Sequence, residues 1–208
     1  APIPEGQTEI VSLWGWPDEW PFWSWKGCEG KPLQVRVFTK ASHVKLELNG
    51  KVIGEKDLKI DDKYIAVFEV PYHPGELKAI ASDNGKVVAS KILKTTGDPV
   101  AIRLTADRST IKADRSDLSF VKVEVVDKDG LLVPTDSVRI KISVSGAGEL
   151  AASGTASPLD MESVNGEVIK TFKGKALAIV RPYKNSGKII LKVVAEGLTS
   201  AELKIECR

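Results

Sequence analysis

The 208-residue sequence has little of what a membrane protein or a nucleic-acid-binding protein requires. No apolar run approaches the roughly 20 residues of a membrane-spanning helix, so no membrane partner is predicted. The formal net charge is only +2, which is too small to indicate a nucleic-acid surface. Asn-X-Ser/Thr sequons are absent, because each asparagine precedes glycine or a Ser-Gly pair.

Cysteine and histidine are equally scarce. Cys28 and Cys207 lie near opposite ends of the sequence, which excludes a disulfide framework and predicts two unpaired thiols. His43 and His73 have no cysteine, histidine or carboxylate at metal-ligand spacing, so both are expected on the surface. No phosphate-binding glycine loop or nucleophile motif occurs. The sequence therefore predicts neither a metal nor another cofactor.

The chain begins with Ala1-Pro2-Ile3-Pro4, without an initiator methionine or a signal peptide. We therefore expect it to be a piece of a longer polypeptide.

Tryptophan, by contrast, is concentrated in one short segment. All five tryptophans lie in the stretch LWGWPDEWPFWSWKG, at Trp14, Trp16, Trp20, Trp23 and Trp25. Each indole can bury roughly 150–250 Å². A loop interrupted by two prolines cannot cover these rings by itself, so they must pack elsewhere.

Three interpretations of this segment remain open. The favoured one is anchoring on the body of the protein and packing between domains. The second is contact with sugar rings, which stack on aromatic faces. The third is a protein partner or an effect of truncation. The first predicts self-association of the isolated chain through residues 14–25, because an uncovered apolar patch favours association.

The remaining sequence is dominated by short alternating runs separated by turn residues, which predicts an all-β, antiparallel fold. The run 43–48 ends at Asn49-Gly50, the strongest short hairpin signal, and 51–54 pairs back. A second hairpin spans 77–93 around Asn84-Gly85, and convincing helical periodicity is lacking. Further strands are expected at 33–38, 64–70, 100–106, 118–126, 138–144, 176–180, 189–194 and 201–205.

The stretch from Thr95 to Pro99 breaks the strand pattern and marks a boundary. We expect a tryptophan-rich segment plus a first sandwich over 1–97, and a second, bacterial immunoglobulin-like sandwich over 98–208. About seven strands in about 100 residues fit each of two tandem immunoglobulin-like β-sandwich domains. The Gly/Ala/Ser-rich stretch 146–158 is expected to be a loop.

Two acidic motifs are candidates for calcium binding or acid/base chemistry. Asp127-Lys128-Asp129-Gly130 superficially resembles a calcium loop but lacks the flanking ligands, so a hairpin turn is favoured. The neighbouring Asp61 and Asp62 would point apart on a strand or turn, which favours two solvated carboxylates over an acid/base pair.

Several motifs occur in one order along nearly the whole chain. They include the Trp14–Glu19 and Trp23–Trp25 runs, the hairpin at 44–51 and the VPYHPGELKAIA stretch at 70–81. The second half adds 102–108, 123–127, 160–163 and 174–181. Together they resemble the region that follows the catalytic barrel in family 2 β-galactosidase-like glycoside hydrolases.

This resemblance implies a parent that is a retaining glycosidase with two barrel glutamates. No position here matches the Asn-Glu motif of the acid/base, so the resemblance implies no catalytic residue in this chain. It implies instead an accessory region that packs on the catalytic barrel of the parent, where it could shape the substrate cleft. The alternatives are a carbohydrate-binding module that uses the tryptophan cluster and a cell-surface immunoglobulin-like spacer. We expect a bacterial periplasmic or extracellular protein, where such hydrolases usually meet polymeric substrates.

Overall fold

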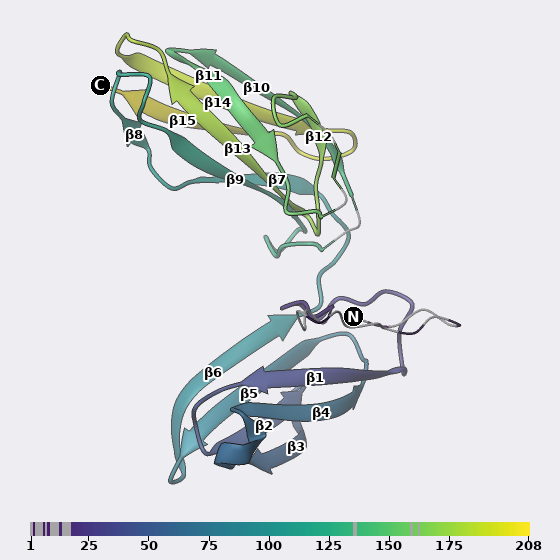
Figure 1. Cartoon of the computed structure of the whole chain (residues 1–208). Helices are drawn as coiled ribbons and strands as arrows, with labels where there is room; N and C mark the ends of the chain where they lie inside the picture. Colours follow the sequence, from purple (N-terminus) through teal and green to yellow (C-terminus); the bar gives the residue numbers. More distant parts are fainter. Residues whose placement is uncertain are drawn as a thin grey trace. The chain divides into compact units, whose positions relative to one another are not determined.

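The computed structural model describes residues 2, 6, 8, 13, 18–134, 137–158, 160–161 and 163–208. It divides the chain into two compact units, Ala1–Thr95 and Thr96–Arg208, hereafter unit 1 and unit 2 (Figure 1). The break falls two residues before the expected boundary. No helix in the described part is long and apolar enough to cross a membrane.

Unit 1 contains six described strands and one 3₁₀ turn, η1 (Ile60–Asp62). The strands are β1 (Pro32–Phe38), β2 (His43–Leu48), β3 (Lys51–Asp57), β4 (Ile65–Pro71), β5 (Glu76–Asp83) and β6 (Lys86–Lys94). Strands β3-β2-β5-β6 form one antiparallel sheet, and β1 pairs with β4 in a two-stranded ribbon across its face (Figure 1).

The core of unit 1 lies between this ribbon and the sheet. Inward side chains alternate along β2, where Val44, Leu46 and Leu48 are buried, and they meet Ala66, Phe68 and Val70 of β4. The period of two that predicted these strands is therefore the period of burial.

Both predicted hairpin turns of unit 1 are confirmed. Asn49 and Gly50 have φ of 52° and 78°, and Asn84 and Gly85 have 50° and 77°. These left-handed pairs suit the type I′ turn that Asn-Gly sequences favour. Asp61 and Asp62 are exposed in η1, where the Asp62 Oδ2 accepts a hydrogen bond from the Lys59 amide at 2.6 Å.

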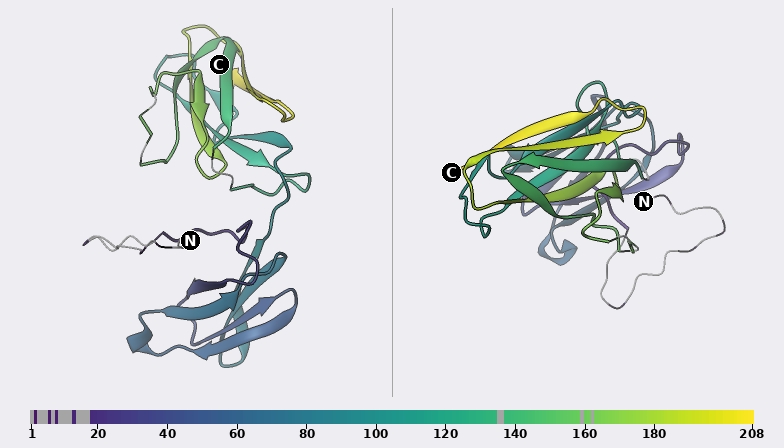
Figure 2. Two further views of the ribbon diagram at one scale, coloured as in Figure 1. Left: turned by 90° about the vertical axis from the view of Figure 1, so that its right-hand side faces the viewer. Right: turned by 90° about the horizontal axis from the view of Figure 1, so that it is seen from above.

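Unit 2 contains nine described strands in two sheets, seen from two further sides in Figure 2. The strands are β7 (Ala101–Ala106), β8 (Thr110–Ile111), β9 (Ser119–Val126), β10 (Arg139–Gly146), β11 (Gly148–Gly154), β12 (Val168–Lys170), β13 (Lys175–Pro182), β14 (Gly187–Ala195) and β15 (Ala201–Cys207). One sheet has the order β12-β10-β14-β15-β8, the other β11-β13-β9-β7.

The two sheets of unit 2 enclose a core of aliphatic side chains. Ile140, Ile142, Ile189, Leu191 and Ile205 come from one sheet. They face Val121, Val123, Ala178 and Val180 of the other. The all-β sandwich fold is thus confirmed, although the strands number six and nine rather than about seven in each unit.

The expectation of a loop over 146–158 is wrong for Gly148–Gly154, whereas residues 155–158 lie outside any strand. Residues Gly148–Gly154 form β11, which pairs antiparallel with β13 around a bulge between Leu150 and Ala152. Close packing explains the glycine at position 148, because a Cβ on Gly148 would lie 2.6 Å from Ile189 Cδ1 and 2.7 Å from the Arg181 carbonyl oxygen. Strand pairing across the sandwich, rather than local propensity, makes this segment extended.

The turn interpretation of residues 127–130 is confirmed. The Asp127 Oδ1 accepts hydrogen bonds from the amides of Asp129 and Leu131 at 3.0 and 2.9 Å. Its Oδ2 accepts one from the Gly97 amide at 2.9 Å, and Gly130 has φ of 73°. The carboxylate that would have been a calcium ligand is therefore committed to three backbone amides of its own unit.

Each unit holds one free cysteine: Cys28 is half-buried in unit 1, and Cys207 is buried in unit 2. The Cys207 thiol donates to the Asn185 carbonyl oxygen at 3.6 Å. Burial, and secondarily the charge of Asp114, raises the pKa of this thiol. Two unpaired thiols were predicted, and both are found.

Candidate functional site

The candidate site is the described part of the tryptophan segment, residues 18–25 of unit 1. Trp14 and Trp16, the first two tryptophans of the predicted contact surface, lie outside the described residues. Trp20, Trp23 and Trp25 are described, and they occupy three different environments.

Trp23 is an internal anchor of unit 1. Its side chain is only 2% exposed and belongs to the core cluster. The indole Nε1 donates a hydrogen bond to the His73 carbonyl oxygen at 3.0 Å, and the ring packs edge-to-face on Tyr72 with centroids 5.1 Å apart. A buried indole with a satisfied N–H is stable in such a position.

This position corrects the expectation for Trp23. A side chain with almost no exposed area offers no face to a sugar or to another domain. It does satisfy the other part of the favoured interpretation, namely anchoring of the segment on the body of the protein.

The backbone around Trp23 is fixed as well. The Thr95 hydroxyl donates to the Trp23 carbonyl oxygen at 2.6 Å and accepts from the Gly75 amide at 3.0 Å. Two residues further on, the Trp25 amide donates to the buried Tyr72 hydroxyl at 3.1 Å. The segment thus lies on unit 1 as a hydrogen-bonded strap.

Three other described aromatic rings of this strap contact one another. Trp20 and Phe22 are stacked with centroids 6.3 Å apart, and Phe22 lies 4.7 Å from Trp25. All three rings are half-buried. Trp25 packs on the edge of the core cluster, whereas Trp20 and Phe22 lie outside it. We call Trp20, Phe22 and Trp25 the aromatic array.

Polar contacts hold the beginning of the described segment. Glu19 pairs with Arg36 of β1, and the Trp20 indole donates to the Asp18 carboxylate. The array is therefore tied to unit 1 on both sides, which lowers the entropic cost of presenting it to a partner.

Neither of the two histidines belongs to a metal site in the described part of the chain. His43 faces acidic partners, with Nδ1 2.7 Å from Asp57 Oδ1 and Nε2 3.8 Å from Glu55 Oε2. His73 is exposed and contributes its carbonyl to Trp23. Among the described residues, no group of three or more histidine, cysteine or acidic side chains is placed to hold a metal ion.

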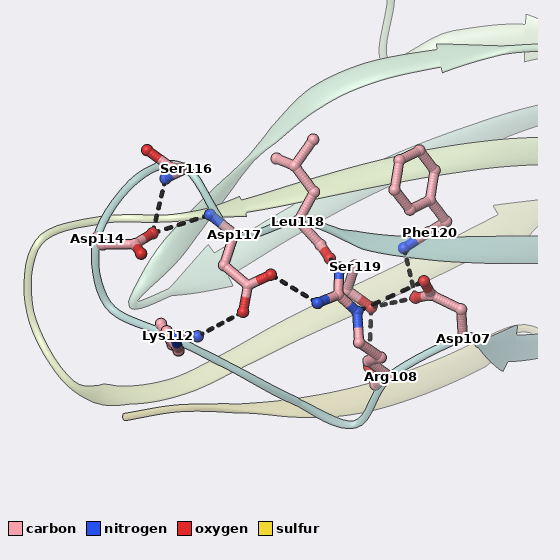
Figure 3. Close-up of polar contacts among 9 residues, drawn as sticks. All are labelled: Asp107, Arg108, Lys112, Asp114, Ser116, Asp117, Leu118, Ser119 and Phe120. Atoms are coloured by element: carbon pink, nitrogen blue, oxygen red, sulfur yellow. Dashed lines mark hydrogen bonds and ion pairs between the residues drawn. The ribbon is translucent and has the colours of Figure 1, made fainter.

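A polar network in unit 2 closes the loop between β7 and β9 (Figure 3). The Asp117 carboxylate accepts from Arg108 Nη1 at 2.6 Å and from the Lys112 amide at 2.9 Å. Asp114 accepts from the amides of Ser116 and Asp117, both at 2.8 Å. No motif in the sequence indicates this network, because its pairs are set by the geometry of the loop.

The displaced pKa values of described carboxyl groups all move in one direction. Backbone hydrogen bonds lower the pKa of Asp114 and Asp117. Burial opposes ionisation of Glu124 and Asp127, but hydrogen bonds outweigh it, and the pKa of each is lowered. These groups are stabilised as carboxylates, whereas a glycosidase acid needs a raised pKa.

Comparisons with known proteins agree with the sequence motifs. Residues 102–204 match the glycoside hydrolase family 2 C-terminal domain 5, and residues 30–89 match a domain of unknown function, DUF4982. The chain is 39% identical over 186 residues to a β-galactosidase of Bacteroides ovatus, covering 89% of this chain and 22% of that protein.

A second curated relative is a β-glucuronidase of Formosa agariphila, 28% identical over 69% of this chain and 14% of that protein. The solved structure of a glycosyl hydrolase family 2 member from Bacteroides cellulosilyticus matches with a TM-score of 0.93 and 33% identity. It covers all of this chain, which spans 27% of that protein.

The class that emerges is a pair of β-sandwich domains of the kind found in large glycoside hydrolases. More narrowly, the chain belongs to the C-terminal domains of glycoside hydrolase family 2, as its motifs predicted. It spans 22% and 14% of the lengths of the two curated relatives and 27% of the length of the solved structure.

Proposed function

We propose that this chain is the accessory, non-catalytic region of a retaining, β-galactosidase-like glycosidase and packs on its catalytic barrel through the aromatic array. The observation that carries the proposal is the difference in burial between Trp23 and the other described aromatic residues of the segment. Trp23 fixes the strap in the core of unit 1, whereas the rings of Trp20, Phe22 and Trp25 are only half-buried.

The energetics favour a protein partner for the array. Three large rings held in place bury further apolar area at roughly 25 cal/mol per Å² when another surface covers them. Aromatic side chains are enriched at the centres of protein interfaces, where they carry most of the binding energy. The same contact would let the array form one wall of the substrate cleft.

The substrate of the whole enzyme is proposed as a β-galactoside or a related glycan. Support comes from the names of the relatives, two of which are β-galactosidases while a third is a β-glucuronidase. The glycosidic bond would be broken in the barrel.

The test asks whether the aromatic array is needed for binding to the barrel. The barrel portion of the parent polypeptide is expressed apart from residues 1–208, and co-purification of the two pieces is measured. We expect capture by the wild-type chain and loss of capture with Trp20→Ser/Phe22→Ser. Val87→Ser, an exposed apolar residue of β6, is the matched control and should leave capture unchanged.

Two further measurements would contradict the proposal. The purified chain should not turn over an aryl β-galactoside, so turnover abolished by changing one of its own carboxylates would refute a non-catalytic role. Quenching of tryptophan fluorescence by millimolar galactosides, lost in Trp20→Ser, would replace barrel packing with a carbohydrate-binding function.

We also propose that the parent is exported to the periplasm or the outside of a bacterial cell. The named relatives are bacterial, and polymeric glycans are met outside the cytoplasm. Fractionation of the source cells, with detection by an antibody against this chain, tests this; recovery only in the cytoplasm would refute it.

A further inference from the structure

Unit 2 carries a second surface whose composition differs from that of the aromatic array. It is the outer face of the sheet β11-β13-β9-β7, which we call the cationic face. Strand alternation and pairing assign its side chains, because residues on one face of a strand recur every second position. Its outward charged residues on the strands are Arg103, Lys122, Glu124, Glu149, Lys175 and Arg181.

These four cations and two carboxylates give the cationic face a formal charge of 4 − 2 = +2, equal to that of the whole chain. Each carboxylate is shared by two cations. Glu124 Oε2 lies 3.0 Å from Arg103 Nη2, and its Oε1 lies 3.1 Å from Lys122 Nζ. The face therefore attracts anions although its carboxylates are paired.

The second carboxylate repeats this arrangement at the opposite end of the sheet. Glu149 Oε1 lies 2.9 Å from Arg181 Nη2 and 3.1 Å from Nη2 of Arg115, which reaches in from the neighbouring loop. With Arg115 included, two guanidinium groups hold one carboxylate. One positive charge is left over at this end.

The middle of the cationic face is apolar. Phe120 is directly opposite Ile179 across the strand pair, and Leu177 is two residues along β13. Phe120 and Leu177 remain 39% and 38% exposed, and Ile179 is half-buried. Three large apolar side chains side by side on an outer sheet face form a patch rather than a scatter.

The polar network of the β7–β9 loop fixes the backbone of this patch. The Phe120 amide donates to Asp107 Oδ1 at 2.8 Å, and the neighbouring Ser119 hydroxyl donates to the Arg108 carbonyl oxygen at 2.9 Å. Figure 3 shows the Phe120 ring directed away from these contacts. The ring is thus presented outward from an anchored strand.

The arrangement decides between ligand classes. From Lys175 to Arg181 the face extends for roughly 20 Å along β13 at about 3.3 Å per residue. A polyanionic glycan carries charge at every sugar and would place carboxylates over the apolar middle, where they would be desolvated. A second copy presenting the same face would meet like charge. A protein surface with an apolar centre and acidic ends is complementary to both the apolar middle and the charged ends of the cationic face.

The area of the cationic face indicates whether its partner is a separate protein or a domain of the same polypeptide. Four strands about 4.8 Å apart and 20 Å long offer about 300 Å² on this side, or about 600 Å² in total. A stable complex of separate proteins buries about 1,600 Å², whereas contacts between domains of one polypeptide begin near 600 Å². The smaller area suffices when a covalent connection raises the effective concentration.

We therefore propose that the cationic face binds an acidic, apolar-centred surface of another domain in the same longer polypeptide. This inference rests on the proposed function in so far as it requires a longer parent. It concerns unit 2 alone and does not depend on the aromatic array.

The experiment measures lysine acetylation rates in the whole parent polypeptide and in the 208-residue chain. Lys122 and Lys175 should react about tenfold more slowly in the parent, because the docked domain covers them. Lys188 and Lys204, exposed on the other sheet, should react equally in both. Equal rates for Lys122 and Lys175 in the two proteins would overturn the proposal.

Variants of Lys175 and Phe120 test whether positive charge and apolar contact hold the docked domain on the cationic face. Lys175→Glu should restore the acetylation rate of Lys122 in the parent to that in the isolated chain, whereas Lys204→Glu, the matched control, should not. Protection that survives both Lys175→Glu and Phe120→Ser would refute docking at this face. Binding of the isolated chain to polygalacturonate, lost in Lys175→Glu, would instead identify a polyanionic glycan and overturn the protein partner.

The two proposals fail separately. If Trp20→Ser/Phe22→Ser leaves barrel capture intact while Lys122 and Lys175 remain protected, barrel packing through the array fails and the inference about unit 2 stands. If capture depends on the array but the lysines are unprotected, the inference about unit 2 fails alone.

Discussion

Replacement of Trp23 by alanine tests the claim that the tryptophan segment is built into unit 1. The side chain is 2% exposed, so the change removes a fully buried indole from the core. Large-to-small changes of this kind cost about 3–5 kcal/mol. The change also removes the part-buried hydrogen bond to the His73 carbonyl, which adds about 1 kcal/mol.

The assay is thermal or urea unfolding of the 208-residue chain followed by circular dichroism. Small domains are stable by about 5–15 kcal/mol, so Trp23→Ala should remove a large part of the stability of unit 1. At about 4–8 °C per kcal/mol for a domain of this size, its midpoint should fall by 15 °C or more. The transition of unit 2 is the internal control and should not move.

Two milder variants sharpen the test. Trp23→Phe keeps most of the packing on Tyr72 but loses the N–H donor, so it should cost about 1–3 kcal/mol. Trp20→Ala, outside the core cluster, should cost less than about 1 kcal/mol. If Trp23→Ala and Trp20→Ala lowered the stability of unit 1 equally, the assignment of Trp23 as the anchor would be refuted.

Three other predictions follow from contacts described above. The isolated chain should self-associate through the tryptophan segment, so sedimentation at increasing concentration should show a monomer–oligomer equilibrium that Trp20→Ser/Phe22→Ser shifts to monomer; a strict monomer in the wild type would contradict this. Unit 2 should lose stability in acid: the pKa values of Asp114, Asp117, Glu124 and Asp127 are lowered in the folded state, so their contribution is complete above the ordinary values of 3.8 for aspartate and 4.5 for glutamate and is lost as the pH falls through the folded values. Its urea midpoint should therefore be flat from about pH 6 to 7 and fall below about pH 4.5, and an unchanged midpoint down to pH 3 would be the contrary result. Gly174→Ala should destabilise unit 2 by about 1–3 kcal/mol in the same unfolding assay, because φ is 72° and the new Cβ would lie 2.1 Å from the Val133 carbonyl oxygen, whereas Gly154→Ala, with open space around it, should be near neutral.

Much of the fold was predictable because one periodicity governs it. Alternation along 43–48 and 118–126 located β2 and β9, and Asn-Gly pairs located two hairpin turns. What local pattern could not indicate was pairing between distant segments. The two-residue strand β8 exists because it pairs in parallel with the end of β15, and β11 exists because β13 lies beside it.

The candidate site was predictable in composition but not in detail. Five clustered indoles indicated that some surface must cover them. Which of the rings is covered depends on Tyr72 and Thr95, which lie 47 or more residues away in sequence from the segment they hold. The cationic face was missed for a related reason: Lys122, Phe120 and Leu177 become neighbours only once the strand register is known.

The buried thiol of unit 2 provides a built-in reporter of local opening. Cys207 is buried with a raised pKa, so a reagent that attacks thiolates reaches it only after unit 2 opens. Cys28, half-buried in unit 1, packs on the same core cluster as Trp23. Alkylation kinetics of Cys207 in the unmodified chain would thus time the opening of unit 2, with no label introduced, while the half-buried Cys28 reacts as an accessible thiol of the same chain.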